Sequence, residues 1–326
     1  MENNSLLRLA SLCACTWIVY LAAIGPEQAI NNIYRHWEVT ITMIFGSFAA
    51  GSTALGGGAI AFPVFTKILH TPPFEAKIFS LMIQSIGMGA ATFLIIMNKI
   101  KVEWNIVLLG TLSGSLGITI SSYYIYPLLS PTMIKLLFTM LLSSFGLTLL
   151  FMLIKDNRYN EKMVIWTKRE KTIVLVAGCI GGLISGLQGS GIDIVIFSVM
   201  VLIFRISETI ATPTSVVIMA LNSIAGSILH NLVYNDVPSI VIEYWYSAIP
   251  VVVIGAPLGA HLCSTLTRQS IVKALIFLIA IEAISTFALT QLDMKYIFVC
   301  ATLLILFLLS NIMMMNIGTK LYKSYN

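Results

Sequence analysis

Two glycine-rich clusters interrupt apolar stretches at matching places in the two halves of this chain. The first occupies residues 51–58 within the apolar stretch 40–69, and the second occupies residues 186–191 within the stretch 172–204. Glycine-interrupted apolar segments at corresponding positions of two halves are typical of the substrate site of a secondary transporter. The sequence therefore predicts a transport site before it says anything about the transported molecule.

A small oxyanion is the ligand that such breaks are suited to bind. The N-terminus of a half-helix offers free N–H groups and a partial positive charge, so an anion can bind there without a cationic side chain. Glycine has no Cβ, which lets the main chain approach the anion closely. The alternative is close helix packing, to which small residues in membrane helices also contribute. The predicted site-lining residues are Gly56, Gly57 and Gly58 in the first half and Gly189, Ser190 and Gly191 in the second.

Polar side chains near the breaks form a second group of candidate ligands. Gln84 and Asn222 rank first, because each lies on the helix expected after a break. Amide and hydroxyl donors can distinguish an oxyanion from chloride by their geometry. The same side chains can instead join neighbouring helices by hydrogen bonds. The other candidates are Ser85, Gln188, Thr212, Thr214 and Ser215.

Asp193 is the acid that we single out inside the apolar spans. A carboxylate within the membrane is costly and marks a functional site by default. Asp193 carries a coupling proton or binds a coupling cation such as Na⁺, or it caps the half-helix that follows it; these roles are not exclusive. One acid alone does not supply the several carboxylates of a dedicated cation site.

Lys77 follows Pro72 and Pro73 at the start of an expected helix. We predict that its ammonium group lies in a vestibule and attracts anions toward the site. The alternative is that the long side chain extends to the lipid headgroups.

The composition places these residues in an all-α polytopic membrane protein. Of 326 residues, 58% are hydrophobic and 10% are charged, which excludes a soluble globular chain. Repeated apolar runs are long enough to cross a bilayer core of about 30 Å, and they predict about 8–10 membrane segments. Residues 6–25 are a retained first helix or a cleaved signal, and we favour the helix. The expected spans are 6–25, 40–69, 75–97, 104–125, 132–154, 172–204, 208–232, 244–265, 270–290 and 295–316.

The positive net charge of +5 indicates a membrane orientation rather than nucleic-acid binding. Six of the nineteen Lys and Arg residues lie in the polar connector 155–171, which predicts that this connector is cytoplasmic and faces anionic lipid. If all ten spans crossed, Lys and Arg would divide ten inside to nine outside. If the two broken spans instead enter and leave on one face, the division is fourteen to five. The charge rule favours re-entrant segments, although broken helices that cross fully remain an alternative.

The two halves also resemble each other in sequence. Residues 46–92 align without a gap on 181–227, and three glycines fall in register at five-residue spacing. With re-entrant breaks each half has three full crossings, an odd number, so the halves form inverted-topology repeats. The expected divisions are an N-terminal helix and loop (1–39), a first transporter repeat (40–154), the connector (155–171), a second repeat (172–290) and a C-terminal helix and tail (291–326).

The motifs resemble those of the TauE/SafE sulfite-exporter family over about residues 40–290. The first half carries the pattern G-x(4)-GGG-x(4)-P from Gly51 to Pro63, and the second carries a glycine-rich element from Gly186 to Asp193. The resemblance implies a multi-spanning protein of the inner or plasma membrane that moves sulfite, sulfonates and related organosulfur anions, usually outward. Ile192 and Asp193 replace the last two glycines of the usual second element, as in a branch with GSGID and ATPTS signatures.

These observations together predict a secondary transporter, in the exporting direction, for a small sulfur-containing anion. The expected partners are this anion, a coupling proton or Na⁺, and the lipid bilayer; a homo-oligomer is left open. Transport of another small anion or of a cation is the first alternative. An intramembrane enzyme and a structural subunit are the others, although HExxH, GxSxG and Walker A motifs are absent from the sequence. We therefore expect no catalytic residues, no metal ligands and no cofactor.

Overall fold

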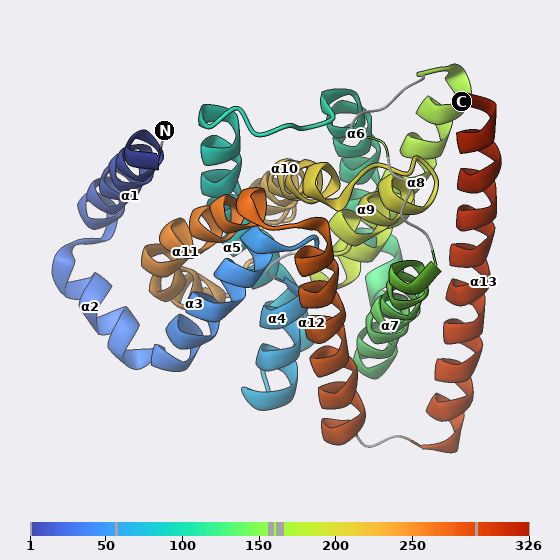
Figure 1. The fold of residues 1–326 in the computed structure, drawn as a ribbon. Helices are drawn as coiled ribbons and strands as arrows, with labels where there is room; N and C mark the ends of the chain where they lie inside the picture. The colour runs from blue at the N-terminus through green and yellow to red at the C-terminus, as the bar shows by residue number, and fades with distance from the viewer. Residues whose placement is uncertain (1, 56–57, 156–159, 161–165, 291–292, 326) are drawn as a thin grey trace.

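The protein is an all-helical bundle in the computed structural model, which describes residues 2–55, 58–155, 160, 166–290 and 293–325. Within these ranges nine helices are long and apolar enough to cross a membrane, and the only bridge between extended residues joins Asn160 to Ile206. The predicted all-α polytopic architecture is confirmed (Figure 1). The α-helices and shorter π or 3-10 turns (η) are α1 (Glu2–Ile24), α2 (Pro26–Arg35), α3 (Trp37–Ser52), α4 (Gly58–Pro63), η1 (Val64–Ile68), α5 (Pro73–Met97), α6 (Trp104–Ile120), η2 (Ser121–Ile125), η3 (Tyr126–Leu128), α7 (Pro131–Lys155), α8 (Lys168–Gln188), α9 (Ile192–Leu202), α10 (Glu208–Ile228), η4 (Leu229–Tyr234), α11 (Ser239–Thr265), α12 (Arg268–Leu289) and α13 (Met294–Tyr325).

Local sequence signals explain where several helices begin and end. Pro26 and Pro73 occupy the first turns of α2 and α5, where the missing N–H costs nothing. Thr167 and Glu170 form a reciprocal capping box at the start of α8, and Gly189 ends that helix in the left-handed conformation. The segment before residue 40, expected to contain a loop, also holds the ten-residue helix α2. Residues 156–159 and 161–165 of the connector lie outside the described residues.

The chain folds back on itself at both glycine clusters. In the second half, Ile192 of α9 donates its main-chain N–H to Ser185 Oγ at 2.9 Å, and a Cβ placed on Gly181 would lie 3.2 Å from Val195. In the first half, a Cβ on Gly46 would lie 3.7 Å from Ile60 of α4. The Gly181–Val195 and Gly46–Ile60 contacts each join residues fourteen positions apart across a break. Helices α8 and α9, and helices α3 and α4, are therefore hairpins rather than straight broken rods.

Glycines allow each hairpin to lie directly against a helix of the other half. α6 packs along α8, and α11 packs along α3. A Cβ on Gly117 of α6 would overlap the carbonyl of Cys179, and a Cβ on Gly259 of α11 would overlap the carbonyl of Phe48. Main chains that approach this closely require small residues at the contact. Close packing is thus the structural role of Gly117 and Gly259.

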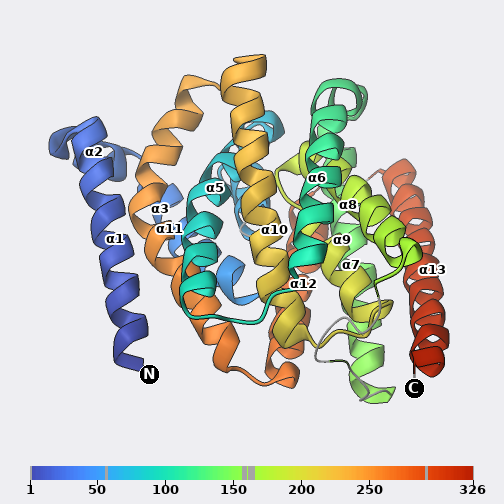
Figure 2. The same ribbon diagram turned by 90° about the horizontal axis from the view of Figure 1, so that it is seen from above.

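The first and last long helices lie at opposite edges of the bundle (Figures 1 and 2). Only 11% of the apolar window is buried in α1, and the same fraction holds for α13. α1 contacts α2, α5 and α11, whereas α13 packs chiefly on α7. Both helices are therefore peripheral to the hairpin core.

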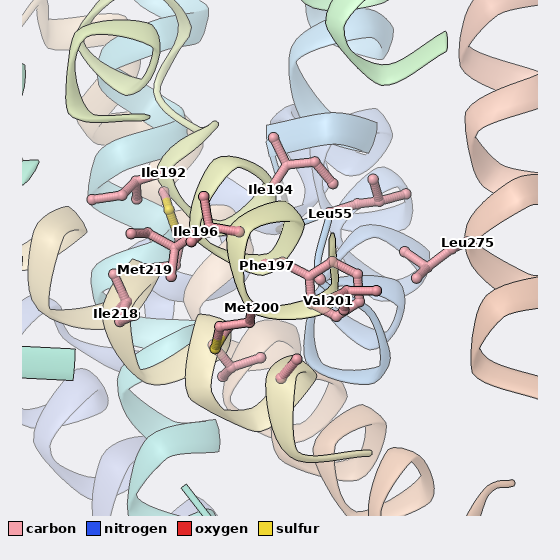
Figure 3. Packing of buried hydrophobic residues seen from close by; sticks show 14 of the residues in the cluster. Leu55, Ile192, Ile194, Ile196, Phe197, Met200, Val201, Ile218, Met219 and Leu275 are labelled. Carbon is pink, nitrogen blue, oxygen red and sulfur yellow. The ribbon is translucent and has the colours of Figure 1, made fainter. Parts of the chain in front are cut away.

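The two hairpins share one hydrophobic core. Leu55, which follows α3, belongs to the same buried cluster as Ile194 and Phe197 of α9 and Leu275 of α12. Figure 3 shows Leu55 beside Ile194 and Phe197, so the turn of the first hairpin lies against the outgoing arm of the second. A displacement of either hairpin would thus disturb the packing of the other.

Candidate functional site

The turn of the second hairpin is built from two glycines in conformations that other residues rarely adopt. Gly189 has φ +86° and Gly191 has φ +138°. A Cβ on Gly189 would lie 2.5 Å from the main-chain oxygen of Lys77 on α5. The glycines at 189 and 191 are therefore required both by the backbone conformation and by the close approach of α5. The predicted position of the break is confirmed.

Gln84 connects α5 to this turn. Its side-chain nitrogen donates to the carbonyl of Gly189 at 2.9 Å, and it lies 2.9 Å from the carbonyl and 3.0 Å from the hydroxyl of Ser80. Gln84 is buried, with 2% of its surface exposed. The structure thus brings one of the two first-ranked polar residues into direct contact with the break.

Asp193 caps the short helix that leaves the turn. Its Oδ1 accepts hydrogen bonds from the N–H groups of Gly191 and Ile194, each at 3.0 Å. The side chain is buried, and Oδ2 has no hydrogen-bond partner among the described residues. The capping contacts proposed from the sequence are present, and they fill part of the N-terminus of α9 that was expected to be free. The second carboxylate oxygen is left for another role.

Further polar atoms around the turn also lack partners within the described part of the chain. Gln188 donates to the carbonyl of Ser190 at 3.2 Å, but its Oε1 is buried without a donor. The Ser190 hydroxyl and Gln84 Oε1 are likewise buried and unpaired. Buried polar groups without partners are uncommon and mark a place where a ligand or water completes the bonding. Most of these open atoms are oxygens that accept hydrogen bonds.

Lys77 supplies the positive charge beside the turn. Its side chain is completely buried, and none of the described residues accepts a hydrogen bond from Nζ. The ammonium lies 5.0 Å from the ring centroid of Phe74 and 4.1 Å from that of Tyr126. Aromatic faces stabilise a cation without neutralising it. In this conformation Lys77 is enclosed by the protein rather than extended to the membrane surface.

His230 lies close to the same rings. Its Nδ1 is 2.8 Å from Asp236 Oδ1, and its ring is 6.3 Å from that of Phe74. The other nitrogen, Nε2, is buried and unpaired within the described residues. The nearby acid is thus already bound to a histidine and does not bond to the Lys77 ammonium.

The candidates on α10 mainly join helices and loops. Thr214 donates to the carbonyl of Ile210 at 2.7 Å and accepts from the N–H of Glu103 at 3.1 Å. Asn222 donates to the carbonyl of Ile218 and accepts from Ser115 of α6 at 3.4 Å. These contacts correspond to the interhelical alternative.

Three other candidates lie on α10 and α5. Ser215 donates to the carbonyl of Thr212 at 2.8 Å, and the Thr212 hydroxyl is buried with no partner among the described residues. Ser85 is partly buried and donates to the carbonyl of Met82 within α5. None of these contacts reaches the turn at residues 189–191.

The first break is described only in part. α3 ends at Ser52 and α4 begins at Gly58, whereas Gly56 and Gly57 lie outside the described residues. Thr53 is buried, and its hydroxyl donates to the carbonyl of Ala49 at 2.8 Å. The role of the three consecutive glycines stays a prediction from the sequence.

Besides Glu170 of the α8 capping box, two buried carboxylates were missed by the sequence analysis, which singled out Asp193. Glu282 of α12 forms an ion pair with Lys67 of η1, with Nζ 3.2 Å from Oε1. Glu208, at the first turn of α10, lies 2.5 Å from Arg268. The signal available in the sequence was an ionisable residue inside or beside an apolar run. Lys67 and Glu282 are 215 residues apart, so no local sequence pattern indicates that they pair.

A family model described as "Sulfite exporter TauE/SafE" matches residues 39–286. The chain belongs to the TauE/SafE sulfite exporter family. The matched range agrees with the predicted resemblance over about 40–290 and contains both hairpins. Comparisons with curated proteins and with solved structures gave no match.

Membership of the TauE/SafE family gives the fold a function at a coarse level. The family comprises transporters, in agreement with the expectation that the chain is not an enzyme. Together with nine apolar helices in the described residues, it establishes an integral, multi-pass membrane protein. The family implies a membrane transporter of the sulfite or anion exporter type.

Proposed function

We propose that this TauE/SafE protein is a secondary transporter that exports small sulfur-containing anions, such as sulfite or organosulfonates, across the plasma (inner) membrane. Transport is coupled to a proton or another ion. The family match supports the class of transported molecule. The enclosed Lys77 ammonium is the single structural observation that favours an anion over a cation or a neutral solute.

A buried cation without an acceptor is energetically costly, so its retention calls for an anion during the functional cycle. The Lys77 main chain touches Gly189, which places the base of this side chain at the hairpin turn. Asp236 acts on the ammonium through its charge, but its Oδ1 is bonded to His230, and no described carboxylate bonds directly to Lys77 Nζ. We infer that a substrate anion pairs with Lys77 on its way to or from the turn.

The paired hairpins support an alternating-access mechanism. Each hairpin packs on a helix of the other half: α3 with α11, and α8 with α6. This exchanged packing is the arrangement expected of inverted-topology repeats, in which the halves rock against each other around the site. Gly56, Gly57, Gly58, Ser190 and Gly191 would line the pathway at the two turns.

The open oxygens of the second turn favour a coupling cation rather than the anion itself. Asp193 Oδ2, Gln188 Oε1 and Gln84 Oε1 are acceptors without donors among the described residues. A proton on Asp193, or Na⁺ coordinated by such oxygens, would satisfy them. We propose that the coupling ion binds at Asp193 and the substrate anion binds on the Lys77 side of the turn.

A ligand screen of the purified protein tests this proposal. Thermal unfolding is followed with sulfite, sulfate, thiosulfate, sulfoacetate, taurine and chloride. The proposal predicts that one or more sulfur oxyanions raise the midpoint of unfolding above the chloride value in wild-type protein but not in Lys77→Gln. Lys273→Gln, which removes an exposed lysine of α12, is the matched control. Equal shifts in wild type and Lys77→Gln would contradict the assignment of Lys77.

A further inference from the structure

A buried ion pair joins the first hairpin to a helix of the second half. Lys67 lies on η1, which continues the outgoing arm of the first hairpin, and Glu282 lies on α12. Their side chains are 3% and 6% exposed. Charged side chains inside a membrane protein are costly and mark function by default. Neither residue contacts the hairpin turn described above.

In this pair, the Lys67 ammonium has a full set of hydrogen bonds, whereas the Glu282 carboxylate does not. Lys67 Nζ has three acceptors, namely Glu282 Oε1 at 3.2 Å, Ser285 Oγ at 3.3 Å and Thr286 Oγ1 at 2.5 Å. An ammonium has three N–H donors, so Lys67 is saturated.

The carboxylate is unevenly used. Oε1 of Glu282 also accepts from Thr139 and Thr286, both at 3.0 Å. Oε2 is buried and has no partner among the described residues. An unpaired carboxylate oxygen in this position can take up a proton without displacing any existing hydrogen bond.

Three elements meet at this ion pair, namely η1, α7 and α12. Lys135 of α7 donates to the carbonyl of Thr66 at 3.2 Å, and Thr139 of the same helix bonds to Glu282. The outgoing arm of the first hairpin is thus held to both α7 and α12. Lys67 aligns with Leu202 in the second half, so the lysine of this pair has no counterpart at the aligned position.

We propose that Glu282 is a second proton-binding site and that its protonation weakens the attachment of the first hairpin to α12. A proton adds to Oε2 and converts the carboxylate to a neutral acid, so the attraction for Lys67 is lost. No other covalent bond forms or breaks. This inference rests on the proposed function for its role in coupling, but the proton site itself can be tested without transport.

Charged and hydroxyl groups from three elements surround the Glu282 carboxylate. Lys67 of η1 is its charged partner, Thr139 of α7 and Thr286 of α12 donate to Oε1, and Lys135 of α7 bonds to Thr66, next to Lys67. Glu282 is seven residues before the end of α12, about 10 Å along the helix at 1.5 Å per residue. Glu282 therefore lies about two turns from the end of α12.

Hydrogen exchange measured by mass spectrometry tests the proton site directly. Exchange of the peptide containing residues 64–68 is compared across a pH series in wild type, Glu282→Gln and Glu208→Gln. The proposal predicts that, relative to the intrinsic exchange rate at each pH, acid lowers the protection of this peptide in wild type and in Glu208→Gln. In Glu282→Gln the protection is low at every pH. Glu208 is the matched control because it is also a buried, paired acid, but its partner is Arg268, a guanidinium that stays charged. Protection of this peptide that does not change with pH in wild type would overturn the proposal.

Transport in proteoliposomes tests the role in coupling. Glu282→Gln is expected to lose accumulation driven by a pH gradient while it retains substrate counterflow, which needs no net proton movement. Wild-type accumulation in Glu282→Gln would refute the coupling role. Absence of anion counterflow in wild type would instead refute the proposed function and leave the exchange experiment valid.

Discussion

The side-chain amide of Gln84 donates a hydrogen bond of 2.9 Å to the carbonyl of Gly189. This bond joins α5, in the first half of the chain, to the turn between α8 and α9 in the second. Both residues are buried, so water cannot replace the bond while the site stays closed. A movement of the second hairpin away from α5 must therefore break it.

Replacement of Gln84 by Met should loosen the hairpin turn. Met has a similar length but no amide, and the Gly189 carbonyl would be left buried without its donor, at a cost of about 1–3 kcal/mol. We expect a lower midpoint of thermal unfolding and a lower transport rate. Ser85→Ala, which removes a hydroxyl bonded only within α5, serves as the control. An unchanged transport rate in Gln84→Met would show that the bond does not hold the site.

Gly189→Ala tests the requirement for a left-handed glycine. At φ +86° a Cβ would meet the main-chain oxygen of Lys77 and the side chain of Ser80, each at 2.5 Å. Because the backbone is strained and α5 must shift, we expect folded protein with little or no transport, or loss of about 1–3 kcal/mol of stability. Gly89→Ala on the same α5 is the control, since nothing lies within 4 Å of its Cβ position. Similar behaviour of the two variants would contradict the tight fit at residue 189.

Two substitutions at Asp193 separate capping from coupling. Asp193→Asn keeps an oxygen for the N–H groups of Gly191 and Ile194 but removes the charge. Asp193→Ala removes the cap as well, which should lower the free energy of unfolding by a further amount of about 0.5–2 kcal/mol. We expect Asp193→Asn to unfold near the wild-type temperature and to lose coupled flux in proteoliposomes. Wild-type dependence on pH and on Na⁺ in Asp193→Asn would reduce the residue to a cap.

Lys77→Gln should weaken the capture of anions. The substitution removes the positive charge between the Phe74 and Tyr126 rings and keeps part of the buried volume. We expect KM for the anion to rise, with a smaller effect on a neutral competitor. Lys77→Arg restores the charge and should recover part of the affinity. If Lys77→Gln binds the anion as wild type does, the ammonium has only a structural role.

The main features of the fold were accessible from the sequence because they depend on local patterns. Apolar runs of sufficient length predicted the membrane helices, and the glycines at 189 and 191 predicted a break where the structure has positive φ angles. The glycine alignment predicted equivalent places in both halves, and the Gly46–Ile60 and Gly181–Val195 contacts do occur at equivalent places. The charge rule favoured segments that enter and leave the membrane on one face; the chain folds back at both positions, and their re-entrance into the membrane stays a prediction.

The polar contacts of the site were less accessible because they join distant parts of the chain. Gln84 was ranked first on its position after a break, but its partner Gly189 lies 105 residues away. Asn222 was ranked equally by the same argument, and it bonds to Ser115 of α6 rather than to a turn. No local sequence pattern links Lys67 and Glu282, so their ion pair could not be predicted from the sequence.

The central claim is that this TauE/SafE protein carries a small sulfur-containing anion past the Lys77 side of the second hairpin. Counterflow of radiolabelled sulfite in proteoliposomes, with unlabelled sulfite, taurine, sulfoacetate or chloride inside, tests it most directly. The account predicts that at least one sulfur-containing anion drives counterflow, that chloride does not, and that Lys77→Gln reduces the flux. Counterflow that is absent for every sulfur-containing anion, or unaffected by Lys77→Gln, would contradict it.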